Sequence, residues 1–110
     1  MQRTFIELPQ FTRCWKSMGL NDADLRRLQN EIINAPNIGA VMQGTGGLRK
    51  MRFSYDDRGK SGSSRVCYVD IVVKETVFLI TAYPKNEKDN LSKAERNNIK
   101  KVIEQLERTL

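Results

Sequence analysis

The chain has 110 residues, of which 29% are charged and 39% hydrophobic, and its formal net charge is +6. This length suits a single domain over residues 1–110. No apolar stretch approaches the roughly 18 residues of a membrane span, and no secretory pattern opens the sequence. We therefore expect a cytoplasmic protein without a membrane partner. The absence of histidine, with only two cysteines, excludes histidine-activated serine or cysteine catalysis and a zinc site of the Cys/His type.

The first third of the chain predicts one strand and two helices. Residues 2–8 are compatible with a short strand, and Phe11 and Trp15 lie at helical spacing in a helix predicted over 10–18. Asn21 and Asp24 have the spacing of a helix cap, so a second helix should follow at once and form a hairpin with the first. Its inner stripe should consist of Leu25, Leu28, Ile32 and Ile33.

The rest of the chain predicts a sheet and a closing helix. Residues 37–47 are rich in glycine and predict a loop, after which strand-like runs occupy 48–55, 65–74 and 76–83. Ser92 and Glu95 match a capping box for a helix whose inner face should hold Ile99, Val102, Ile103 and Leu106. The order β-α-α-β-β-β-α predicts an α+β domain: a small antiparallel sheet packed by an N-terminal helical hairpin and a C-terminal helix.

Positive charge is concentrated in and around the first hairpin of this sheet. Lys50 and Arg52 alternate along one strand and should project from the same face. Arg65 opens the next strand and Lys85 follows the third, so antiparallel pairing could bring all four together. Such a cluster suits a polyanion such as RNA. The alternative is a basic hairpin that is simply solvated and keeps the sheet edge from aggregating.

Three segments in order resemble the RelE/HigB superfamily of toxins, and its HigB-type branch most of all: GGLRKMR at 46–52, GSSRVCY at 62–68 and LITAYPKNE at 79–87. The resemblance covers nearly the whole chain and implies a single RelE-like domain. It implies the toxin half of a type II toxin–antitoxin pair, which enters the ribosomal A site and cleaves mRNA during translation. A cognate antitoxin, the ribosome and mRNA are then the implied partners, and neither a metal nor a small-molecule cofactor is expected.

The resemblance also assigns roles to individual residues. Arg65 matches the arginine that supports the scissile phosphate, Lys50 and Arg52 match basic strand positions, and Lys85 lies at or beside a cationic position after the last strand. RelE proper has a tyrosine shortly afterwards, whereas this chain continues EKDNL over 87–91. The identity of the general base therefore stays open.

RNA supplies its own nucleophile, the 2′-hydroxyl, so the protein needs only to align it, move protons and stabilise charge on the phosphorane. Lys85 or Lys50 could transfer the proton while Arg65 and Arg52 hold the phosphate, since a lysine crowded by cations releases its proton more easily. Glu87 is either an alternative base or a surface carboxylate. Further RNA contacts are expected from Arg49, Arg58, Lys60, Tyr68 and Lys88, although a strand tyrosine such as Tyr68 can equally well pack in the core.

Two other functions fit the same pattern. One is a non-catalytic module that binds RNA or the ribosome through the same basic surface. The other belongs to the ParE branch of this fold, which acts on DNA gyrase. The gathered lysines and arginines favour RNA over gyrase.

Overall fold

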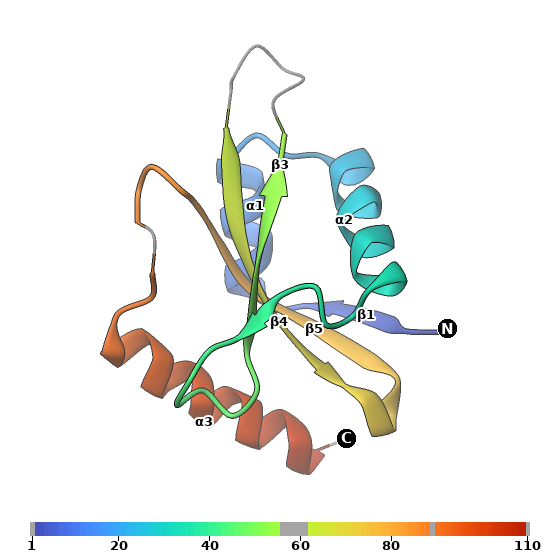
Figure 1. Ribbon diagram of the computed structural model, residues 1–110, viewed down its shortest axis with the longest axis vertical. Coiled ribbons are helices and arrows are strands. Elements are labelled where there is room, and N and C mark those ends of the chain that lie inside the picture. The colour runs from blue at the N-terminus through green and yellow to red at the C-terminus, as the bar shows by residue number, and fades with distance from the viewer. Residues whose placement is uncertain (1, 56–61, 89, 110) are drawn as a thin grey trace.

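The computed structural model describes residues 2–55, 62–88 and 90–109. In chain order its elements are β1 (Thr4–Glu7), α1 (Pro9–Ser17), α2 (Asp22–Asn34), β2 (Ala40–Val41), β3 (Arg49–Ser54), β4 (Ser63–Ile71), the 3-10 turn η1 (Val72–Lys74), β5 (Thr76–Pro84) and α3 (Lys93–Thr109). The strands form one five-stranded sheet in the order β1-β5-β4-β3-β2 (Figure 1). The predicted α+β class and the order of the long elements are confirmed.

Three details of the sheet differ from the prediction. The sheet is not wholly antiparallel, because β1 and β5 pair in parallel. β5 is the last strand in the chain and lies beside the first one. The segment 37–47, predicted to be a loop, contains β2, whose two residues are too few to show the alternating pattern of a strand. The strand predicted to 74 ends at Ile71, since η1 and the left-handed Glu75 (φ 48°) turn the chain into β5.

The helical hairpin forms for the reasons that the sequence indicated. The Asn21 side chain accepts a hydrogen bond from the Asp24 amide (2.9 Å), and the Asp24 carboxylate accepts one from the Asn21 amide (2.8 Å). The two helices join through Gly19, whose φ of +75° lies in the left-handed region that glycine adopts without strain. Phe11 and Trp15 are buried and stack at 5.3 Å between ring centroids.

The sheet separates two apolar clusters. On one face α1 and α2 pack against β3, β4 and β5, around Phe11, Leu28 and Phe53 among others. On the other face α3 packs against Leu48, Cys67, Ile80 and further residues through Ile103. Figure 1 shows α3 lying across the end of the sheet away from the β3–β4 connection.

The closing helix begins as predicted, with the Ser92 hydroxyl accepting from the Glu95 amide (3.1 Å) and the Glu95 carboxylate accepting from the Ser92 amide (2.8 Å). Ile99, Ile103 and Leu106 pack against the sheet. Val102 does not, because it points partly outward and keeps 38% of its surface exposed. In the part of the chain that is described, no helix is both long enough and apolar enough to cross a bilayer.

Candidate functional site

Sheet register brings three predicted basic residues onto one face. Arg52 on β3 lies directly opposite Arg65 on β4, and Arg65 lies opposite Tyr83 on β5. Lys50 lies opposite Cys67, whose side chain belongs to the α3 cluster. Directly opposed residues of antiparallel strands share a face, and like charges in such positions destabilise a sheet. An arginine opposite an arginine is therefore a local cost to folding, which is more typical of a binding surface than of a structural one.

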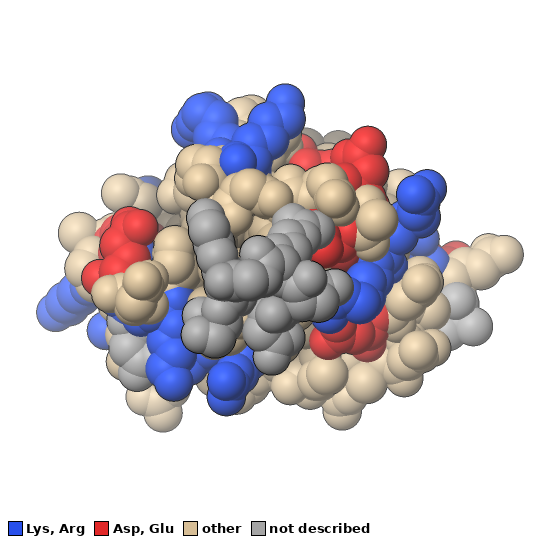
Figure 2. Space-filling model, turned by 90° about the horizontal axis from the view of Figure 1, so that it is seen from above, with Lys and Arg blue, Asp and Glu red and all other residues tan. Residues whose placement is uncertain are grey.

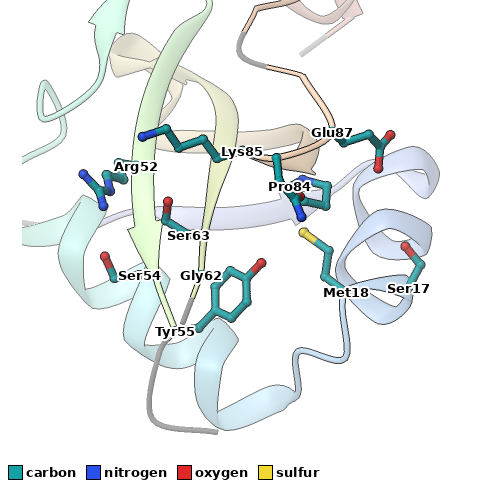
Figure 3. Close-up of a pocket in the computed structure, with 11 residues that line it drawn as sticks. Ser17, Met18, Arg52, Ser54, Tyr55, Gly62, Ser63, Pro84, Lys85 and Glu87 are labelled. Carbon is teal, nitrogen blue, oxygen red and sulfur yellow. The ribbon is translucent and has the colours of Figure 1, made fainter. Parts of the chain in front are cut away.

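A groove lies where β5 stops and β3 and β4 continue beyond it. Ser54 still pairs with Ser63 there, while the amide of Lys85 donates to the Ser63 carbonyl (3.1 Å) as the chain leaves β5. The space between this part of the hairpin and the end of α1 is an open cavity of about 780 Å³. Its lining includes Met18, Arg52, Tyr55, Ser63, Pro84 and Lys85 (Figure 3).

The charged side chains of this groove do not all point the same way. Figure 3 shows the Lys85 side chain extending toward Arg52, whereas the Glu87 carboxylate is turned away from both. Lys85 and Glu87 are both exposed. The groove therefore presents two cations together, with its carboxylate directed elsewhere. Figure 2 looks onto the molecule from above and shows several groups of Lys and Arg atoms on this side, with Asp and Glu atoms between them.

Two further predicted cations are tied to the 85–92 segment. The Lys50 amine donates to the Asn90 side-chain oxygen (2.5 Å). The Lys88 amine pairs with the Glu95 carboxylate (2.6 Å) and lies 5.1 Å from the centroid of the Tyr83 ring. This hydrogen bond from Lys88 is the main reason why the pKa of Glu95 is lowered. These contacts fix the segment after β5 against β3 and the start of α3.

One expected RNA contact, Tyr68, is wrong, and Arg49 lies on the other face of the sheet from Lys50. Tyr68 is fully buried, and its hydroxyl donates to the Pro36 carbonyl (2.7 Å) and accepts from the Gly39 amide (3.1 Å), so its ring cannot stack on a base. The same burial raises the pKa of Tyr68. Arg49 alternates with Lys50 onto the opposite face, where its guanidinium donates to the Gly39 carbonyl (2.7 Å). Both side chains instead hold the segment that leads into β2.

Arg58 and Lys60 lie outside the described residues. Cys67 is buried beneath α3, and although Lys50 and Lys88 act in the opposite direction, burial raises the pKa of its thiol to about 12. A buried thiol that keeps its proton is unreactive. Within residues 2–55, 62–88 and 90–109, no three His, Cys, Asp or Glu side chains gather as a metal site would require.

Sequence reasoning missed the apolar wall of the groove. The sequence pattern places Met18 at the end of the helix predicted over 10–18 and Tyr55 at the end of the strand predicted over 48–55, and it marks neither as a site residue. The structure places both of them, with Pro84, beside Arg52 and Lys85. The available signal was an aromatic residue at the point where a basic strand ends, but nothing local indicates that the end of α1 lies next to it.

Comparison with known proteins gives two findings. The family described as the RelE toxin of the RelE/RelB toxin–antitoxin system matches residues 3–109. Among solved structures, the chain is similar to the E. coli toxin RelE in the free state, in a mutant with two arginines replaced by alanine. That match has 20% sequence identity, covers 100% of both chains and has a TM-score of 0.51, so it supports a common fold.

Proposed function

The chain belongs to the RelE toxin family, the toxin side of a toxin–antitoxin system, and on that premise we propose that it is a ribosome-dependent endoribonuclease that cleaves mRNA in the A site. Its partners are then a cognate antitoxin protein, the ribosome and mRNA. Cleavage of mRNA inhibits translation, which is the toxic effect.

The observation that carries this proposal is that Arg52 and Lys85 line one groove, while Arg65 lies directly opposite Arg52 on the neighbouring strand. Two guanidinium groups on adjacent strands present planar donors to the non-bridging oxygens of one phosphate. The helical layers have no equivalent role, because their inner residues are apolar and buried.

The bonds that form and break are all in the RNA, which the ribosome presents in the A site. The 2′-oxygen attacks the neighbouring phosphorus as the bond from phosphorus to the 5′-oxygen of the next nucleotide breaks. The 2′-hydroxyl loses a proton and the departing 5′-oxygen gains one. Arg52 and Arg65 stabilise the negative charge that develops on the phosphorane.

Lys85 is the residue to which we assign proton transfer. Its amine extends into the groove toward Arg52, whereas Lys50 is hydrogen-bonded to Asn90 and the Glu87 carboxylate is turned away. Positioned general acid–base groups contribute typically about 10²- to 10⁴-fold. Lys50 then adds positive charge along the strand, and Glu87 is a surface carboxylate.

The test compares naked mRNA with mRNA on translating ribosomes, each incubated with the purified protein before the 5′ ends are mapped. We expect cuts in register with the reading frame, and only when ribosomes are present. Arg65→Ala and Lys85→Ala should lose most of this cutting. Arg108→Ala, which removes an exposed cation in the last turn of α3, should retain it.

Other results would point elsewhere. Equal cutting of naked RNA, or no cutting in either sample, would contradict the proposal. The non-catalytic module is the better description if the wild-type protein binds ribosomes but yields no RNA product, and if Arg65→Ala weakens that binding. Inhibition of gyrase supercoiling would favour the ParE branch.

A further inference from the structure

The groove has an aromatic side chain that the phosphate-binding role does not use. Of the three tyrosines in the chain, Tyr68 and Tyr83 are 0% and 4% exposed and belong to the two cores. Tyr55 is only partly buried and lines the groove. A tyrosine that is held on one side and open on the other has the properties of a binding surface.

Tyr55 is held in place by the hairpin itself. Its amide hydrogen-bonds the Gly62 carbonyl (3.3 Å), which continues the pairing of β3 with β4. The ring passes directly over Gly62, where an added Cβ would lie 3.4 Å from Cε2. Part of the ring also packs against the cluster under α1 and α2. The ring is therefore fixed before any ligand arrives.

The exposed part of Tyr55 faces other groups suited to a flat, partly polar ligand. Figure 3 shows the hydroxyl end of Tyr55 directed into the groove on the side of Met18. Met18 and Pro84 make the wall apolar, and two polar residues, Ser63 and Asn86, are also part of the lining. These polar groups can donate to or accept from the edge of a ring that stacks on Tyr55.

We propose that Tyr55, together with Met18 and Pro84, forms a subsite for one nucleobase, that of a nucleotide adjoining the phosphate held by Arg52 and Arg65. This inference rests on the proposed function. A nucleotide joins an anion to a flat ring, and this groove joins two cations to an aromatic wall. A peptide segment would satisfy the apolar wall, but it would leave the charges of Arg52 and Lys85 unmatched, so the nucleobase is the better fit.

The subsite has a consequence for substrate choice. Stacking on an aromatic ring tolerates any base, because every base has a π face. Hydrogen bonds from Ser63 and Asn86 would add discrimination, because they address the base edge. Tyr55 should therefore control the rate on all codons, and the polar lining should control the preference among them.

The experiment measures single-turnover cleavage on ribosomes that carry a defined A-site codon. Each nucleotide that adjoins the cut is in turn either natural or abasic, so that the sugar–phosphate backbone stays intact. We expect one abasic position to slow the wild-type protein by about ten- to a hundred-fold, the effect of removing one base stack. Tyr55→Leu keeps the apolar packing and should lose a similar factor on the natural codon, but nothing more on the abasic one. Tyr55→Phe keeps the ring and should restore the dependence on the base that Tyr55→Leu loses.

The outcomes separate the two proposals. No cutting by the wild-type protein on any template would remove the nuclease function, and the subsite with it. Two results would overturn the subsite alone, provided that the wild-type protein cuts normally. One is a Tyr55→Leu variant that cuts as fast as wild type, and the other is a Tyr55→Leu variant that is slowed equally on natural and abasic templates. Thermal unfolding of Tyr55→Leu and Tyr55→Phe shows whether both variants are folded. An unfolded Tyr55→Leu would be replaced by Met18→Ala, for which we expect the same dependence on the base.

Discussion

The two faces of the sheet are built from the same strands but serve different purposes. The face under α1 and α2 is apolar along β3, where Met51 and Phe53 are 4% and 0% exposed. The face toward α3 carries Lys50 and Arg52 at the alternate positions of that strand, and α3 packs only farther along. Helices pack on both faces, and the groove lies at the end of the hairpin, where Arg52 and Tyr55 from alternate positions of the chain both line it. Alternation along β3 is thus what lets one strand contribute to both a core and a binding surface.

The sharpest test of this contrast compares neighbouring residues of β3. Phe53→Ala should lower the free energy of unfolding by about 3–5 kcal/mol, because it leaves a cavity beneath Trp15 and Arg27. Arg52→Ala should change it by less than about 1 kcal/mol, as expected for a side chain on the solvent-facing side. Urea denaturation monitored by Trp15 fluorescence gives both values. Similar losses for both variants would contradict the division of the strand into two functional faces.

The next test concerns activity on the binding face. Arg65→Ala should reduce ribosome-dependent cleavage by about 10²–10³-fold, the usual effect of removing one donor to a developing oxyanion. Arg49→Ala is the matched control, because this arginine is on β3 but on the other face. It should leave the cleavage rate within about threefold of wild type for every molecule that remains folded. Cleavage rates normalised to folded protein distinguish the two, and a larger effect of Arg49→Ala would reverse the assignment of faces.

Smaller effects compare the helical layers. Asn21→Ala removes the cap of α2 and Ser92→Ala that of α3, and each should cost about 1 kcal/mol. Ser92→Ala should in addition slow cleavage, because the 85–92 segment that bears Lys85 is attached through the start of α3. Asn21→Ala should not. Chemical denaturation together with the cleavage assay checks both statements, and identical behaviour of the two variants would show that α3 does not position the segment.

The smallest expected effect is on pH dependence. The pKa of Glu95 is lowered from its ordinary 4.5, chiefly by the hydrogen bond from Lys88. The pair therefore stabilises the fold fully above that ordinary value, and the contribution is lost as the pH falls through the lower folded-state pKa. Because the pair is partly exposed, the contribution should be less than about 1 kcal/mol. Glu95→Gln should flatten the fall of Tm between neutral and acidic pH, and an unchanged profile would contradict this role.

The local patterns of the sequence were sufficient for most of the fold. The Asn21 and Ser92 boxes, the alternation of Lys50 and Arg52 and the glycine after α1 each involve residues within four positions of one another. Where the prediction failed, the deciding contacts were remote. Tyr68 is in the core because the segment at 36–39 supplies its hydrogen-bond partners, and no feature near Tyr68 indicates this.

By itself, therefore, the sequence determined the order of the long elements, most of the inner faces of the helices and the fact that Lys50 and Arg52 share a side, because helix and strand periodicity are properties of the backbone. The tertiary structure alone decided that Arg65 lies opposite Arg52, that Glu87 turns away and that Tyr55 meets Met18 across a groove. These relations depend on strand register and on where β5 stops. Both are settled by packing between segments that are far apart along the chain.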